Sequence, residues 1–488
     1  MDLLDKDLVS IQEVRSLLKT AHEAQKKLAT LNQTQIDRIV KAIADAGYEH
    51  AERLAKLANE ETGFGLWQDK VIKNVFGSKG IYEAIKDEKT VGILAEDRVN
   101  KTMDIGVPVG VIAGVIPSTN PTSTVMYKAQ IALKGGNAIV FSPHPGAKNA
   151  ILETVKVISA AAEKAGMPKG AISTITVPTM EATKELMTNR YTCLILATGG
   201  SAMVKAAYSS GTPAIGVGAG NGPAFIDKSA DVHLAVKRIL DSKTFDNGTI
   251  CASEQSIIVE KCMEEKVTTE LKVQGAYMLN TEESDQLAHF ILRPNGSMNP
   301  AIVGKSVEHI AKLAGLTQVP ASACVLVARE SKVGHLAPYS REKLAPILAL
   351  YVEDSVEAVL EKSIEILHFE GSGHTFSMHA NDEELVKRFS VRIPASRILI
   401  NTPGALGGIG ATTNLFPALT LGCGAVGGSS SSNNIGPLDV INIKRVAYGT
   451  KELEEIRKET PSGSSCCSDQ ISEATLDAIV KKIMQQLI

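Results

Sequence analysis

The chain has 488 residues, of which 44% are hydrophobic and 22% are charged. This composition is typical of a globular protein and excludes a mostly disordered chain. A net charge of −3 gives no overall electrostatic reason to bind nucleic acid or an anionic membrane. The opening MDLLDKDLVSIQEV lacks the basic and apolar regions of a secretory signal, and no charge-free apolar stretch reaches the ~18 residues of a membrane span. We therefore expect a soluble intracellular protein with two or more domains.

Helices are predicted over the first 100 or so residues, because apolar side chains recur there at helical spacing. From residue 101 onward, short β-branched runs alternate with helical stretches. Strands are predicted at Val109–Ile116, Ala138–Phe141, Ile172–Val177 and Cys193–Leu196, and helices at about 122–134 and Ala147–Ala165. Strands separated by long helices form a parallel, doubly wound sheet, and such sheets bind ligands at the carboxyl ends of their strands.

A second alternating set of strands and helices predicts another α/β lobe. It follows a helix at about 231–243, begins near Ser256–Val259 and runs to about residue 420. Val440–Tyr448 has the alternation of a strand. Residues 460–468 have the composition of a linker, and residues 469–488 predict an amphipathic helix. A helix this short is marginal alone in water, so its apolar stripe requires a partner.

The cysteines are odd in number and scattered, which argues against a disulfide framework: Cys193, Cys251, Cys262, Cys324, Cys423, Cys466 and Cys467. Because no CxxC or HExxH motif is present, no metal site is predicted. Cys193, Cys262 and Cys324 are expected to be small buried side chains. Cys251 lies in a glycine-containing loop between a predicted helix and a predicted strand, where its thiol can be either a nucleophile or a packing residue.

Seven segments, each uninformative alone, occur together in one order: Ile116–Pro121, Phe141–Pro145, Ala197–Ser201, Val217–Gly222, the Cys251 loop, Glu342–Pro346 and Leu419–Cys423. In combination they resemble the aldehyde dehydrogenase superfamily, in its coenzyme-A-acylating branch, over about residues 10–450. That branch includes propionaldehyde and acetaldehyde dehydrogenases of bacterial microcompartments. The resemblance implies an α/β aldehyde dehydrogenase fold with a doubly wound cofactor-binding lobe, an α/β catalytic lobe and a β oligomerisation arm.

The implied domains are a cofactor-binding domain at 1–222, a catalytic domain at 223–420, and a return segment with the arm at 421–459. The arm would pair a strand at about 101–112 with the strand at 440–449. Because family members pair such arms between chains, the resemblance implies a homodimer or homotetramer.

The resemblance also implies roles for individual residues. Cys251 would attack an aldehyde to form a thiohemiacetal and then a thioester, and Asn120 with the Cys251 backbone N–H would stabilise the oxyanion. The cofactor, NAD, would contact Pro117, Ser118, Thr119, Ser142, His144, Gly199, Gly200, Ser201, Gly218 and Glu342. Without the resemblance, Asn120 could be a turn residue, Glu342 a solvated carboxylate at a helix start, and Ser142 and His144 loop caps.

The acyl pocket is less well defined. Thr249, Ile250 and Phe416 are candidate wall residues, because their segments flank the nucleophile in the family. His374, placed in a glycine-bearing loop, could assist deprotonation of the coenzyme A thiol or could be structural.

The segment Val217–Gly222 contains no carboxylate, whereas hydrolytic aldehyde dehydrogenases carry a glutamate there that activates water. We therefore expect the thiol of coenzyme A to collect the acyl group of a short-chain aldehyde in a reversible reaction. A hydrolytic enzyme that releases a free acid is the alternative, and a non-catalytic scaffold is a more distant one.

The C-terminal segment is similar to the encapsulation peptides that carry enzymes into bacterial microcompartments. This similarity implies shell or cargo proteins as partners. It also implies a location in the bacterial cytoplasm, within the lumen of a microcompartment.

Overall fold

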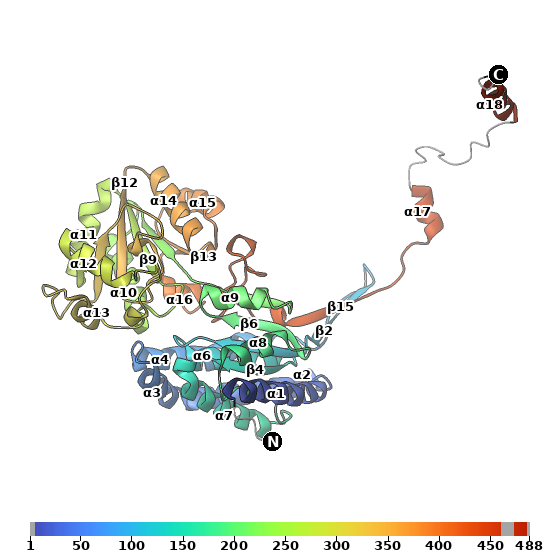
Figure 1. Cartoon of the computed structure of the whole chain (residues 1–488), viewed down its shortest axis with the longest axis horizontal. Helices are drawn as coiled ribbons and strands as arrows, with labels where there is room; N and C mark the ends of the chain where they lie inside the picture. Colours follow the sequence, from blue (N-terminus) through green and yellow to red (C-terminus); the bar gives the residue numbers. More distant parts are fainter. Residues whose placement is uncertain (1–4, 460–472, 486–488) are drawn as a thin grey trace. The chain divides into compact units, whose positions relative to one another are not determined.

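A computed structural model describes residues 5–459 and 473–485 (Figure 1). The chain divides into two compact units. The large unit runs to Leu94, resumes at Ile105 and ends at Lys444; the small unit comprises Ala95–Asp104 and the described residues from Arg445 onward. No helix in the described ranges is long and apolar enough to cross a membrane.

The N-terminal region is helical, as predicted. It contains α1 (Lys6–Leu28), α2 (Gln33–Glu49), α3 (Ala51–Thr62), α4 (Trp67–Val75), a π-helical turn η1 (Phe76–Gly80) and α5 (Ile81–Ile85). Asp5 caps α1, and Asn32 with Gln35 forms a capping box at α2. Their apolar faces, which include Leu18 and Ile39, are fully buried. The apolar residues that recur at helical spacing in the sequence therefore form part of the core of the first lobe.

The first sheet has five parallel strands in the order β5-β4-β3-β6-β7. They are β3 (Val111–Ile116), β4 (Ala138–Pro143), β5 (Ile172–Thr174), β6 (Thr192–Thr198) and β7 (Ala214–Val217). The helices between and after them are α6 (Pro121–Lys134), α7 (Lys148–Lys164), α8 (Met180–Thr188) and α9 (Ser201–Tyr208). Because the strand order reverses between β3 and β6, the carboxyl ends of these two neighbours form the switch point where doubly wound sheets bind ligands.

The second sheet has seven parallel strands in the order β10-β11-β12-β9-β8-β13-β14. They are β8 (Gly222–Ile226), β9 (Glu254–Glu260), β10 (Ala276–Met278), β11 (Val325–Arg329), β12 (Ile347–Glu353), β13 (Gly373–His379) and β14 (Ala395–Ile400). Alternate side chains enter two different cores, as Ile257 and Ile258 of β9 illustrate.

Helices cover both faces of the second sheet (Figure 1). One core contains α10 (Val232–Thr244) and α11 (Glu264–Val273); the other contains α12 (Thr281–Ile291), α13 (Val307–Ala314), α14 (Val356–Phe369) and α15 (Glu383–Arg392). The remaining helices are α16 (Gly404–Gly408), α17 (Leu453–Glu459) and α18 (Glu473–Gln485). Short 3-10 turns complete the chain: η2 (Pro145–Ala147), η3 (Phe245–Gly248), η4 (Lys261–Met263), η5 (Pro300–Ile302), η6 (Pro338–Ser340), η7 (Ala425–Gly427) and η8 (Pro437–Val440).

A third sheet has the order β1-β2-β15, with β1 at Gly92–Asp97, β2 at Thr102–Pro108 and β15 at Ile441–Ala447. The strand predicted over Val440–Tyr448 is confirmed as β15. Its neighbour is β2, from the segment expected to pair with it, although residues 111 and 112 of that segment belong to β3.

Three local predictions are wrong. The strand expected over Ile172–Val177 ends at Thr174, because the N–H groups of Thr176 and Val177 donate to the Glu13 carboxylate instead of a neighbouring strand. Cys193 and Cys262 are exposed and Cys324 is half-buried, so none of the three is a fully buried packing residue. His374 lies in the buried strand β13 and not in a loop.

Candidate active site

The carboxyl edge of the five-stranded sheet gathers most of the residues predicted to bind the cofactor. A cavity of about 730 Å³ opens at this edge. Six of the predicted residues line it: Pro117 after β3, Ser142 and His144 at the end of β4, and Gly199, Gly200 and Ser201 after β6. They meet because parallel strands end at the same edge of a sheet.

The start of α9 is suited to an anionic group. Gly200 precedes the helix in an extended conformation, no side chain caps the helix, and a Cβ atom on Gly200 would meet open space. A helix start without a capping side chain offers N–H donors and the positive end of a dipole. A dinucleotide pyrophosphate fits these properties.

Ser142 and His144 differ in their local roles. The buried Ser142 hydroxyl shares a hydrogen bond of 2.8 Å with Thr183, so it is not a loop cap. The His144 Nδ1 atom accepts the Gly146 N–H at 3.1 Å and does cap the turn η2. His144 nevertheless lines the cavity.

A second cavity, of about 360 Å³, contains the predicted chemistry. It shares Pro117, His144, Thr198, Gly199 and Gly200 with the first cavity, so the two adjoin. Seven more predicted residues line it: Ser118, Thr119, Asn120, Gly218, Thr249, Cys251 and Glu342.

Cys251 follows the turn η3 and precedes β9, and it is half-buried. Burial, followed by the charge of Glu342, raises the pKa of its thiol to about 12. In this structure Cys251 is therefore a neutral thiol at physiological pH, and it must lose its proton to become a nucleophile.

Glu342 lies between the turn η6 and β12 and not at a helix start, which contradicts the alternative that it is a solvated carboxylate at a helix start. Its Oε1 atom accepts the Gly220 N–H at 2.9 Å. Burial raises the pKa of this carboxyl to about 8. Of the residues that line the second cavity, Glu342 is the one carboxylate.

Asn120 is more than a turn residue. It precedes α6 without capping it; its Oδ1 atom accepts a hydrogen bond of 2.6 Å from Lys73, and its Nδ2 atom donates to the Thr249 carbonyl at 3.3 Å. The amide nitrogen thus donates to the backbone two residues before Cys251, and an amide N–H is a group that can stabilise an oxyanion.

The structure does not bring every predicted residue to this cavity. Ile250, His374 and Phe416 are absent from its lining. The Ile250 side chain is buried in the core, and Phe416 packs against Gly436. Burial lowers the pKa of His374 to about 3, so its imidazole is neutral at physiological pH.

Sequence reasoning missed the charged residues beside the cavity, above all Lys70, Lys73 and Asp246, which are buried and paired. A lysine pair three residues apart is typical of a solvated helix face, and Phe-Asp-Asn-Gly is typical of a turn. Lys128 was missed as well: its buried amine donates to Val115 and Leu196 carbonyls at 2.8 Å and ties β3 to β6 at the switch point. Among the described residues, no group of His, Cys, Asp and Glu side chains is placed to hold a metal.

Comparisons with known proteins agree with this geometry. The family model "Aldehyde dehydrogenase family" matches residues 7–314. The bifunctional aldehyde-alcohol dehydrogenase AdhE of Escherichia coli is 45% identical over 451 residues, which are 91% of this chain. The chain spans about half the length of that relative (50%).

Solved structures extend the likeness over nearly the whole chain. A probable aldehyde dehydrogenase from Listeria monocytogenes is 67% identical with a TM-score of 0.92, covering 93% of this chain and 100% of that one. An acetylating aldehyde dehydrogenase from Geobacillus thermoglucosidasius is 52% identical with a TM-score of 0.91, covering 92% and 99%. A Rhodopseudomonas palustris propionaldehyde dehydrogenase with bound propionyl-CoA is 27% identical with a TM-score of 0.80, covering 89% and 94%. By sequence and by fold, the chain belongs to the aldehyde dehydrogenase family.

Proposed function

We propose that this protein is an NAD-dependent, coenzyme-A-acylating dehydrogenase of short-chain aldehydes. One observation carries the proposal: Cys251 and Asn120 line a single cavity, and the adjoining loop from Val217 to Gly222 supplies no carboxylate to activate water. Without a base to activate water, release of the acyl group from a Cys251 thioester requires a second thiol. The acetylating and propionyl-CoA-bound relatives support coenzyme A as its source.

The protein's own atoms account for the first half of the reaction. Cys251 Sγ forms a bond to the aldehyde carbon, the carbonyl π electrons move to oxygen, and the thiol proton leaves to solvent. The Asn120 Nδ2–H donates to the new oxyanion, as a preorganised donor does in acyl transfer. When the carbonyl re-forms, the former aldehyde hydrogen departs as hydride and a thioester remains on Cys251.

A nicotinamide dinucleotide would supply the hydride acceptor. The residues that fit it line the two adjoining cavities. The start of α9 would bind the pyrophosphate, and Glu342 would accept a hydrogen bond from a ribose hydroxyl. Release would then follow by thioester exchange: the coenzyme A thiol loses its proton to solvent as its sulfur bonds to the acyl carbon. The bond from that carbon to Cys251 Sγ breaks, and Cys251 leaves as a thiolate that regains a proton from solvent.

Product analysis tests the proposal. A panel of C2 to C4 aldehydes with NAD should give acyl-CoA when coenzyme A is present and little acid when it is absent. Cys251→Ala should abolish turnover, whereas Cys262→Ala, which changes an exposed thiol outside both cavities, should leave it unchanged. Acid released at full rate without coenzyme A would replace the proposal with the hydrolytic alternative, in which Glu342 would be the carboxylate to test as base. The same assay with NADP in place of NAD tests the cofactor preference, and NADH should form faster than NADPH.

We further propose that β2 and β15 form an oligomerisation arm. Within the described residues, β15 is an edge strand of the sheet β1-β2-β15, and an edge with unpaired backbone groups is suited to pairing with another chain. Light scattering should show a dimer or tetramer. The Tyr448 N–H donates to the Lys101 carbonyl beside β2, so by the alternation along a strand the N–H of Ile443 points to the open edge. Ile443→Pro, which removes that N–H, should shift the protein toward monomers.

We propose that the C-terminal helix α18 docks on microcompartment shell or cargo proteins. The apolar side chains of the described part are about half exposed: Leu476, Ile479, Val480, Ile483 and Met484. Three apolar residues of the helix predicted over 469–488, namely Ile471, Leu487 and Ile488, and the linker at 460–468 lie outside the described residues.

Co-sedimentation with shells tests the docking proposal. Ile479→Glu combined with Ile483→Glu should abolish it and leave kcat unchanged, whereas Lys481→Ala on the opposite face should preserve it. Retention of the double variant in shells would contradict this role.

A further inference from the structure

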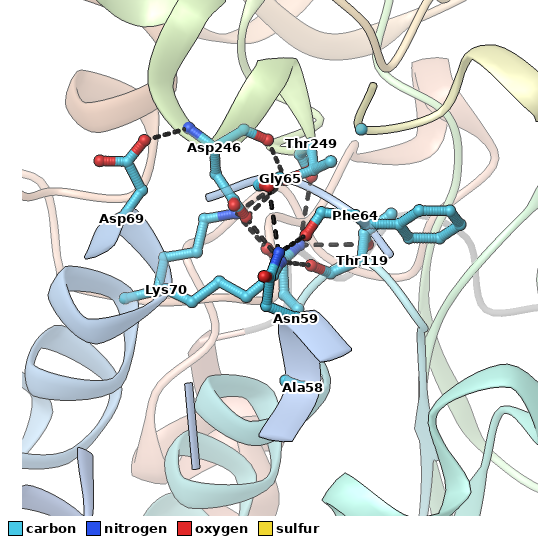
Figure 2. A network of polar contacts seen from close by, with 12 residues as sticks. Ala58, Asn59, Phe64, Gly65, Asp69, Lys70, Thr119, Asp246 and Thr249 are labelled. Carbon is cyan, nitrogen blue, oxygen red and sulfur yellow. Dashed lines mark hydrogen bonds and ion pairs between the residues drawn. The ribbon is translucent and has the colours of Figure 1, made fainter. Parts of the chain in front are cut away.

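A buried cluster of charges connects helix α4 to the loop that carries the nucleophile. Lys70 and Lys73 of α4 and Asp246 of η3 are each less than 4% exposed. Lys70 Nζ donates to Asp246 Oδ2 at 2.9 Å, and Lys73 pairs with the same oxygen. Figure 2 shows Lys70, Asp69 and Thr249 gathered around Asp246. One buried carboxylate balances the charge of only one buried lysine, so the second lysine calls for another explanation.

Lys73 divides its hydrogen bonds among three partners. Besides Asp246, its ammonium donates to Asn120 Oδ1 at 2.6 Å and to Thr249 Oγ1 at 2.9 Å. An ammonium has three donors and no acceptor, so every donor is used. The partners lie 47 to 176 residues away along the chain. Lys73 therefore joins the predicted oxyanion donor to the segment just before Cys251.

The bond to Lys73 sets the direction of the Asn120 amide. Because an ammonium can only donate, the amide oxygen must face Lys73 and the amide nitrogen must face away. Nδ2 then donates to Thr249 O at 3.3 Å and to Thr119 Oγ1 at 3.2 Å, both at the long end of the usual range. A long bond is readily exchanged for a shorter one to an oxyanion, since a charged acceptor binds more strongly.

Lys70 does not reach Asn120. Its second hydrogen bond goes to the Thr119 carbonyl at 3.3 Å. Lys70 and Lys73 thus lie on the same helix, are both buried and share one carboxylate. They differ in their other contacts, because Lys73 reaches the Asn120 amide and the Thr249 hydroxyl, whereas Lys70 reaches the Thr119 carbonyl.

Asp246 anchors the nucleophile loop to α4. Asp246 and Asn247 have φ angles of 48° and 52°, a left-handed conformation that Asp and Asn adopt more readily than most residues other than glycine. The Asp246 N–H donates to Asp69 at 2.7 Å, and Oδ1 accepts the Leu66 N–H at 2.8 Å. A Cβ atom on Gly65 would come 1.7 Å from that same Oδ1, so the segment that precedes α4 packs directly against the loop. These contacts hold the loop in place.

We propose that Lys73 is a positioning residue: its ammonium aims the Asn120 amide at the oxyanion formed on Cys251 and fixes the loop through Asp246 and Thr249. This inference rests on the proposed function for the identity of the reaction. It applies to the oxyanion step, which precedes release of the acyl group.

Lys73→Met tests the inference, with Lys70→Met as the matched control. Both variants lose a lysine from Asp246, so both should lower the thermal midpoint. Only Lys73→Met should lower kcat by about 100-fold or more, the usual cost of a lost oxyanion donor. KM for the aldehyde should change less than about threefold, since the interaction strengthens in the transition state. Lys70→Met should lower kcat by less than about tenfold.

Two further measurements separate positioning from folding. Combined with Asn120→Ala, Lys73→Met should cost little beyond Asn120→Ala alone, because both changes disable one donor. Alkylation of Cys251 by iodoacetamide needs no oxyanion donor, so its rate in Lys73→Met should stay within about threefold of the wild type.

Equal losses of kcat in the two lysine variants, or additive losses with Asn120→Ala, would overturn the inference. The outcome is distinguishable from failure of the proposed function. NADH formation reports the oxyanion step whether the acyl group passes to coenzyme A or to water, whereas the product reports only the second step.

Discussion

Gly220 lies directly against the backbone of Cys251: a Cβ atom on Gly220 would come 2.0 Å from the Cys251 carbonyl oxygen and 3.2 Å from the His374 ring. The loop between β7 and β8 therefore packs directly against the backbone of Cys251. The Gly220 N–H, in turn, donates to Glu342, so the same glycine fixes two of the site residues. Only a residue without a side chain permits this close approach.

Gly220→Ala should displace the Cys251 loop, because a contact of 2.0 Å with backbone can be relieved only by moving backbone. We expect a loss of about 1–3 kcal/mol in the free energy of unfolding, the usual cost of overpacking, and a fall in kcat. Thermal denaturation and NADH formation measure the two effects. At Gly218 a Cβ atom meets open space, so Gly218→Ala should keep the wild-type thermal midpoint. An unchanged midpoint for Gly220→Ala would contradict the packing argument.

Gly218→Glu should introduce hydrolysis. Gly218 lines the cavity that contains Cys251, and its Cβ position is open. A carboxylate there can act as a general base on water, an effect worth about 10²–10⁴-fold when the base is well placed. Steady-state NADH formation without coenzyme A should rise at least about tenfold, with acid as the product. Gly218→Gln has the same shape without the base, and acid formation no faster in Gly218→Glu than in this control would refute the prediction.

Glu342→Gln should make the Cys251 thiol more reactive at alkaline pH. After burial, the charge of Glu342 is the next cause that raises the pKa of Cys251 to about 12, and burial raises the pKa of Glu342 itself to about 8. Removal of an anion favours the thiolate, so the pKa of Cys251 should fall and iodoacetamide inactivation at pH 9.5 should accelerate, by about tenfold for each unit of pKa.

At pH 6 the wild-type Glu342 carboxyl is largely protonated, so the wild type and Glu342→Gln should be alkylated at similar rates. This pH-dependent difference is the internal control. An equal acceleration at both pH values would show that the substitution acts through packing and not through charge.

Glu254→Gln should stabilise the protein at alkaline pH. Oε1 of the buried Glu254 accepts the Gly404 N–H at 2.8 Å, Oε2 has no partner among the described residues, and burial raises the pKa of the carboxyl to about 7. Between its unfolded pKa, near 4.5, and about 7 the folded state binds more protons than the unfolded state, so this group's contribution to stability falls as the pH rises. Above about 7 the loss is complete.

The free energy of unfolding of Glu254→Gln, relative to that of the wild type, should therefore be on the order of 2–3 kcal/mol larger at pH 8 than at pH 4.5. Urea denaturation at the two pH values measures it. Glu383→Gln, on the surface at the start of α15, should show no such pH-dependent gain. If wild type and Glu254→Gln differed in free energy of unfolding by the same amount at both pH values, the argument from ionisation of the buried carboxyl would be contradicted.

Local patterns in the sequence determined the architecture. The β-branched runs at Val111–Ile116 and Ala138–Pro143 are separated by a helix, and that alternation requires a parallel crossover, so the meeting of Pro117 and Ser142 at one edge was predictable. The alternation did not predict where β5 ends, because Glu13, from a helix far away in sequence, takes its backbone donors.

Cys251, Asn120 and Glu342 could be identified from the sequence because each lies in a recognisable segment, and the structure places all three around one cavity. Only the tertiary structure decided what surrounds them. Lys73 and Asp246 are 173 residues apart, and their amphipathic-helix and turn patterns are shared with solvated charges. Periodicity reports which face of an element is buried, but it carries no information about which distant side chain will meet a buried charge; that depends on how the elements pack together.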